Sequence, residues 1–149
     1  MKKALILLVA ILGFTVAANA QSRAIGARVT YGAELSYQHE FGGSAFGEFD
    51  LGWFRNGFSL TGIYDIIFGS VGDLNFYGGP GLATWIYTYK ADNSSNIAFN
   101  LGIAAQLGME YNFPTVPLQL SLDWRPVYYF LNSAGFGWEG FGLGIRYRF

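Results

Sequence analysis

Apolar and polar residues alternate with a period of two over most of this chain. The last nine residues show it most clearly, with one parity apolar and the other small or basic: Phe141, Leu143, Ile145, Tyr147 and Phe149 against Gly142, Gly144, Arg146 and Arg148. A helix would scatter these two sets around its circumference, whereas a strand places them on opposite faces. The pattern therefore predicts β-strands.

Eight segments carry this alternation, separated by residues typical of turns. We expect strands at 25–31, 33–41, 45–53, 58–68, 74–87, 97–113, 118–124 and 141–149. Gly78-Gly79-Pro80-Gly81 lies inside the fifth segment, and proline cannot donate to a ladder, so a bulge or bend is expected there. Sequential hairpins predict an all-β, antiparallel up-and-down arrangement.

The first twenty residues have the pattern of a secretory signal peptide. Lys2 and Lys3 precede an apolar run over 4–16, and Ala18-Asn19-Ala20 supplies the small residues of a cleavage site. We expect cleavage after Ala20, which leaves one domain over 21–149.

The kinds of residue on the two faces favour a membrane-spanning barrel. Only 13% of the residues are charged and 19% are aromatic, whereas an ordinary soluble domain has about a quarter charged residues. In a membrane barrel the apolar face meets lipid and the polar face lines the interior. An eight-stranded barrel is only wide enough for its own side chains, so we expect a filled interior.

Charged residues of the polar parity are expected to pair inside this barrel, because unpaired buried ions are costly. The predicted network consists of Arg28, Glu48, Asp50, Glu110, Asp123, Arg125, Arg146 and Arg148. Glu34, Glu40 and Asp65 share the same parity. Glycines on these faces, among them Gly102, Gly108 and Gly142, leave room for the long arginine side chains.

With eight strands, both termini lie at one end, which for an exported chain is the periplasmic side. The connections near Gly32, Asn56, Asp92 and Ala134 then face outward, and we expect all of them to be short. Such loops offer a place for a protein partner. Aromatic side chains near strand ends, including Tyr31, Trp53, Trp124 and Tyr128 at one rim, are expected to lie at the membrane interface.

Composition excludes several function classes. After removal of Lys2 and Lys3 from the nine basic residues, seven remain against ten acidic ones, which argues against nucleic acid as a partner. The chain has no cysteine, so disulfides, thiolate metal sites and a lipoprotein anchor are excluded. A calcium site at Glu48, Asp50, Glu110 and Asp123 is conceivable from the ligand types, but nearby arginines favour ion pairs. No cofactor is expected.

The signal peptide, the alternating strands and the ending Gly-Leu-Gly-Ile-Arg-Tyr-Arg-Phe resemble those of the small OmpA/OmpX-like outer-membrane β-barrel proteins of Gram-negative bacteria. The resemblance covers nearly all of 21–149. It implies an eight-stranded transmembrane barrel, location in the outer membrane and contact with its lipids. It also implies that Tyr147 and Phe149 form the signal read by the barrel-assembly machinery. In two respects the chain departs from that family: we expect neither the C-terminal peptidoglycan-binding domain of OmpA nor the long extended strands of OmpX-like adhesins, and we do not expect the functions tied to them.

We therefore predict a monomeric outer-membrane barrel with a structural or interaction role and without intrinsic catalysis. Three alternatives remain open. A small pore is disfavoured by the filled interior, and a lipid A-modifying enzyme would need partners for His39, whereas Ser36 and Glu40 have the opposite parity. A soluble lipocalin-like ligand carrier would have the two faces inverted.

Overall fold

The computed structural model describes residues 22–149 except 133 and 139, and every regular element in that part is a β-strand. The expected signal peptide over 1–20 and its cleavage site lie outside the described residues. In the described part of the chain, no helix is long and apolar enough to cross a membrane.

The strands follow the predicted alternation closely, with two short additions. They are β1 (Arg23–Val29), β2 (Ala33–Gly42), β3 (Ala45–Phe54), β4 (Gly57–Val71), β5 (Leu74–Ala91), β6 (Ser94–Asn112), β7 (Leu118–Trp124), β8 (Val127–Tyr129), β9 (Gly135–Gly137) and β10 (Phe141–Arg148).

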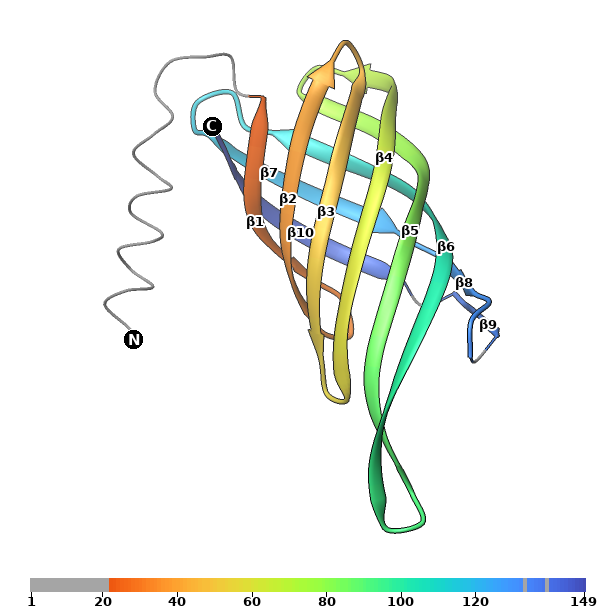
Figure 1. Ribbon diagram of the computed structural model, residues 1–149. Coiled ribbons are helices and arrows are strands. Elements are labelled where there is room, and N and C mark those ends of the chain that lie inside the picture. The colour runs from red at the N-terminus through yellow and green to blue at the C-terminus, as the bar shows by residue number, and fades with distance from the viewer. Residues whose placement is uncertain (1–21, 133, 139) are drawn as a thin grey trace, which may run out of the picture.

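Eight of these strands close into a ring, which is visible in Figure 1. Each strand from β1 to β6 pairs antiparallel with the strand that follows it. The ring is completed by the pairing of β7 with β10 and of β10 with β1. The closing seam between β1 and β10 runs from Ala24 opposite Arg148 to Val29 opposite Leu143. The predicted all-β class and the predicted antiparallel pairing of eight strands are thus confirmed.

The ring has two ends. We call the end that carries Arg23 and Phe149 the terminal end; the turns after β2, β4 and β6 lie there as well. The opposite end, with the turns after β1, β3, β5 and β8, is the far end. Two backbone hydrogen bonds between Arg23 and Phe149, of 3.1 and 2.8 Å, complete the seam at the terminal end.

The short strands β8 and β9 were not predicted. β8 continues the line of β7 along β6 in the same register, with Leu107 opposite Trp124 and Ile103 opposite Tyr128. Pro126 lies between the two pieces, and its carbonyl still accepts a hydrogen bond of 3.1 Å from the amide of Ala105. Proline lacks an amide hydrogen, so the strand is interrupted there although the chain continues straight. β9 then folds back on β8.

At the glycine-proline segment of β5 the ladder with β4 lacks the pairs of Gly79 and Pro80, but it has no bulge there. Ile63 pairs with Gly81 and Ile66 with Gly78, so the register is the same on both sides of Pro80. The shift occurs instead on β4, between Ile67 and Gly69. Proline therefore removes hydrogen bonds from the ladder without displacing it, because the partner strand absorbs no extra residue at that point.

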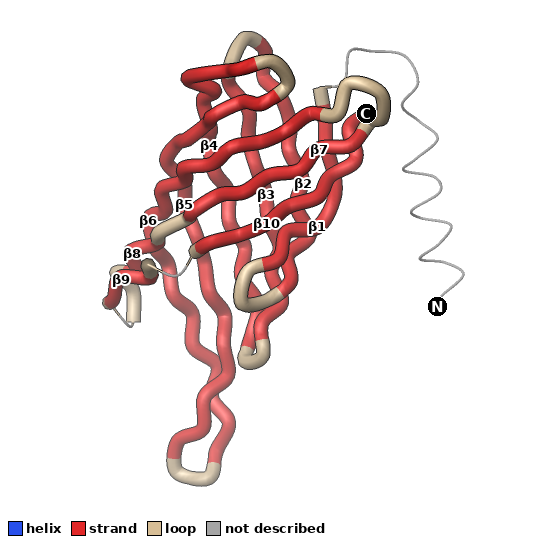
Figure 2. The backbone as a smooth tube through the Cα atoms, turned by 180° about the vertical axis from the view of Figure 1, so that it is seen from behind, coloured by secondary structure: helices blue, strands red, loops and turns tan. Residues whose placement is uncertain are grey.

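The expectation of short outward connections without extended strands is wrong for the hairpin of β5 and β6. β4 pairs with β5 only as far as Gly57 opposite Tyr87, whereas β5 and β6 remain paired to Ala91 opposite Ser94. Residues 88–97, which we call the arm, therefore project beyond the ring at the far end, as Figure 2 shows. Asp92 and Asn93 close it with φ of 48° and 63°, values typical of a tight two-residue hairpin turn.

Candidate functional site

The ring is polar inside and apolar outside. Sixteen buried polar or charged residues stand against six buried apolar ones among the described residues. The outer wall instead exposes large apolar side chains from every long strand, among them Leu35, Phe49, Leu122, Leu143 and Ile145 at 47–60% of their surface. The alternation of the sequence produces this, because odd and even residues of one strand face opposite sides. The interior is therefore the place where chemistry-bearing groups gather.

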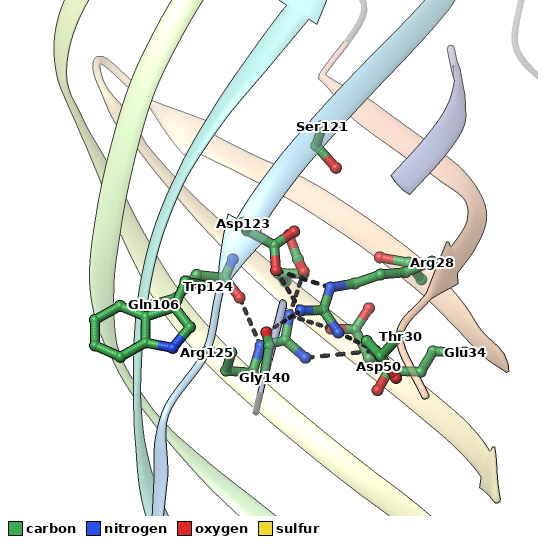
Figure 3. Close-up of polar contacts among 12 residues, drawn as sticks. Arg28, Thr30, Glu34, Asp50, Gln106, Ser121, Asp123, Trp124, Arg125 and Gly140 are labelled. Atoms are coloured by element: carbon green, nitrogen blue, oxygen red, sulfur yellow. Dashed lines mark hydrogen bonds and ion pairs between the residues drawn. The ribbon is translucent and has the colours of Figure 1, made fainter. Parts of the chain in front are cut away.

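Arg28 of β1 forms the first centre of this interior, as drawn in Figure 3. Its Nη1 donates to Glu34 Oε2 of β2 at 2.7 Å, and its Nε donates to Asp123 Oδ1 of β7 at 2.9 Å. Its Nη2 also pairs with Asp123 and donates to the carbonyl of Gly140 at 3.2 Å. One arginine of β1 thus contacts the next strand, β2, and two parts of the chain that are far away in sequence, β7 and the residue before β10.

Arg125, which follows β7, is the second centre. Its Nη2 lies 2.6 Å from Glu48 Oε1 and 2.6 Å from Asp50 Oδ2, both on β3. Its Nε donates to Gln106 Oε1 of β6 at 2.6 Å, and its Nη1 lies 3.6 Å from Glu34 Oε2. Glu34 therefore links the two arginines across the interior.

Arg146 of β10 is the third centre. Its Nη2 lies 3.1 Å from Glu48 Oε2, and its Nε and Nη1 donate to the hydroxyls of Ser36 and Ser121 at 2.9 and 2.8 Å. Because Glu48 is shared with Arg125, the three arginines and four carboxylates form one continuous network. Such a network holds opposite walls of the ring together and occupies the space between them.

A missing side chain makes room for this network at Gly142. A Cβ at that position would overlap the guanidinium of Arg28. Gly142 lies opposite Asp123 in the ladder between β10 and β7. The glycine therefore allows Arg28 to cross the interior and reach the carboxylate.

Two of the eight residues predicted for the ion-pair network lie outside it. Arg148 is only partly buried at the terminal end, and it has no ion pair among the described residues. Glu110 is buried but is held by amides: Gln119 donates to it at 2.7 Å and Asn75 at 3.1 Å. Arg148 is next to the last residue of the strand, so correct parity still places it beyond the enclosed part of the ring.

The other acidic residues of the same parity also differ from one another. Asp65 is fully buried and accepts a hydrogen bond of 3.0 Å from Gln106 Nε2. Glu40 is exposed, since it lies near the terminal end of β2.

A calcium site at the acidic residues of the interior was the other interpretation of the sequence. Arg125 forms ion pairs with both Glu48 and Asp50, and in the described part of the chain no group of three or more potential metal-ligating side chains comes together. The alternative of a calcium site formed by all four acidic residues does not fit this arrangement.

Neutral polar partners were missed by the sequence reasoning. Ser36, Gln38, Gln106, Gln119 and Ser121 all lie buried in the interior. The sequence contains the pattern that places them there, because each lies an even number of positions from a charged residue on its own strand. The predicted network included only charged residues, whereas several of the donors that complete it are uncharged.

The remaining space inside the network is small. A cavity of about 40 Å³ lies between the guanidinium groups of Arg28 and Arg125 and the far end. Its lining also includes Glu34, Trp85 and Tyr129. This volume holds about one water molecule. His39, the only histidine, lies on the other side of the wall, 3.3 Å from the Tyr37 hydroxyl and edge-on to Phe41.

No known family model matches this chain, and no curated protein matches it in sequence. Among solved structures, the N-terminal β-barrel domain of Pseudomonas aeruginosa OprF is similar, with a TM-score of 0.69 and 16% sequence identity. The match covers 88% of this chain and 100% of that chain. At this identity the likeness concerns the fold, which is that of a β-barrel.

Proposed function

We propose that this protein is an integral outer-membrane β-barrel protein with a structural or interaction role and a side-chain-filled lumen. The observation that carries the proposal is the inversion of its two faces. A polar, ion-paired interior and a continuous apolar exterior suit a barrel whose outer wall contacts lipid. A soluble lipocalin-like carrier would need the opposite distribution.

The proposal includes export by the predicted signal peptide and insertion as a monomer. Each of the eight ring strands pairs with two neighbours in the described part of the chain, and such pairing satisfies the backbone groups of a wall in lipid. The network fills the middle of the barrel, which favours a closed lumen over a pore. We propose no catalytic role, since His39 lies among Tyr37 and Phe41 on the outer wall.

Heat-dependent gel mobility of the outer-membrane fraction tests this proposal. We expect the unboiled protein to resist detergent and to migrate differently from the boiled protein, because each strand of the closed ring is hydrogen-bonded to a neighbour on both sides and no ring strand can detach by breaking one pairing alone. A single unshifted band in the soluble periplasmic fraction would contradict the membrane location and favour the soluble carrier.

The same assay tests the proposed assembly signal at Tyr147 and Phe149. Phe149→Ala keeps the backbone hydrogen bonds with Arg23 but removes the terminal ring, so we expect less of the heat-shifting form. Phe41→Ala, which removes another exposed ring at the terminal end (57% exposed), is the matched control and should accumulate normally. Equal reduction in both variants would mean that any terminal-end aromatic serves the same purpose.

The interaction role is assigned to the arm. On the side away from β5, pairing of β6 ends with Gly102 opposite Tyr129, and beyond it Phe130 donates to the carbonyl of Leu101 and the Asn132 side chain to that of Phe99. Residues 94–98 of β6 then present an edge at which an extended peptide adds a strand. We expect a photo-crosslinking residue at Ile97 (77% exposed) to capture a discrete protein in intact cells, and the same residue at Ile145 on the outer wall to capture none. Identical adducts at both positions would refute a specific edge.

A further inference from the structure

An open cup lies at the far end of the barrel, above the ion-pair network. Its volume is about 360 Å³, and its lining includes Tyr31, Trp85, Tyr129, Phe136 and Trp138. Concave sites of this size, mainly aromatic with few polar groups, are typical of small-molecule binding, and barrel mouths are a common place for them.

The rings of the cup come from four separate segments of the chain. Tyr31 follows β1 and stacks on Trp85 of β5 at 6.5 Å between ring centroids, and Trp85 meets Tyr129 of β8 edge-on at 6.2 Å. Phe136 and Trp138 lie 4.2 Å apart on the remaining side. Tyr31 was expected in a membrane-interface belt, but it packs on Phe54 and Trp85 instead, because the turn after β1 carries it over the interior.

Two of these rings are largely uncovered. Tyr31 and Trp138 each expose 63% of their surface. Trp138 also stacks on Trp124 of the outer wall, with 6.2 Å between ring centroids, so only part of its exposed surface faces the cup. Both rings belong to the lining of the cup, and the part of each that faces it can stack on a ligand.

Charge decides which class of compound suits the cup. Arg125 is the one charged side chain in its lining among the described residues. Its guanidinium is already held by Glu48 and Asp50 at 2.6 Å each, so an anion would find no unpaired cation. A cation would instead approach a guanidinium. Within the described part of the lining, neither sign of charge is therefore favoured.

We propose that the cup binds a small, uncharged, flat ring compound, which stacks on Trp138 and Tyr31 above the Arg125 network. This site goes beyond the structural or interaction role proposed above and does not depend on it, since only the fold at the far end is needed.

Ligand-detected saturation-transfer NMR on the refolded protein in lipid vesicles tests the site. The probes are benzamide, benzoate and benzylammonium, which share a ring of one size and differ in charge. We expect saturable binding of benzamide, and affinity about tenfold lower for Trp138→Ala because one stacking partner is lost. Trp53→Ala removes a tryptophan of the outer wall (45% exposed) and should leave binding unchanged.

Several outcomes would overturn the proposal. A linear, non-saturable signal in all three proteins would mean partition into lipid only. Binding of benzoate or benzylammonium as tight as that of benzamide would refute the uncharged class. Heat-dependent gel mobility checks the folding of Trp138→Ala, and if it is lost, Tyr31→Ala replaces it, with the same loss of benzamide affinity expected.

Discussion

Arg125→Met is expected to destabilise the folded protein by about 3–5 kcal/mol, because it removes one member of a buried charge network and leaves the others in place. Asp50 is affected most: its ion pair with Arg125 at 2.6 Å is its only one among the described residues. Glu48 loses one partner but keeps Arg146 at 3.1 Å and Gln38 at 2.7 Å. Methionine has a similar length and cannot compensate either carboxylate.

The urea midpoint of unfolding in lipid vesicles measures this effect. Arg148→Met is the matched control, since it makes the same substitution and removes the same charge at the terminal end, outside the network. We expect a clear decrease for Arg125→Met and almost none for Arg148→Met. Equal midpoints for both variants would show that the network does not contribute to the stability of the barrel.

Leu122→Arg is expected to cost about 2–4 kcal/mol in a bilayer, because the new charge faces the lipid near mid-depth. Leu122 lies near the middle of the line formed by β7 and β8, between Leu143 and Met109, and exposes 48% of its surface. In a water-soluble protein the same change at an exposed position would alter stability by only about 0.5 kcal/mol. The substitution therefore distinguishes lipid from water as the environment of the wall.

Val71→Arg provides the comparison for this second substitution. Val71 ends β4 at the terminal end and is 72% exposed, where an arginine reaches the interface and costs about 0–1 kcal/mol. The free energy of unfolding of each variant is measured in lipid vesicles. We expect a larger loss for Leu122→Arg than for Val71→Arg, because position 122 lies deeper in the bilayer. Similar small losses for both would contradict a lipid-facing wall.

Parity along the chain was enough to predict the eight strands of the ring and the faces of the residues that they contain. Arg28, Glu48 and Arg146 all lie inside the ring because their neighbours on the same strand alternate correctly. Parity gives no depth, however, and for this reason Arg148 was placed in a network that it does not reach. Contacts such as that between Arg125 and Glu48, 77 positions apart, depend on how opposite walls of the closed ring face each other. No local pattern contains that information.

The arm and the strands β8 and β9 were missed for a different reason. Residues 91–96 are small and polar, which is typical of a loop, and the tight turn at Asp92 and Asn93 was not distinguished from one. β8 and β9 are three residues each and follow Pro126, so they carry too little alternation to be recognised. Pairing with the long strand β6 stabilises β8 there, an influence of distant sequence on local structure.

The seam between the first and the last strand has a consequence for timing. β1 acquires its second neighbour only when β10 is in place, and contacts between the two ends of a chain are the slowest kind to form. Until then β1 has an open backbone edge, and apolar side chains project from one of its faces. Before β10 pairs with β1, the chain can therefore aggregate through this open edge and the exposed apolar side chains. In water, another molecule has to cover that edge until β10 is in place.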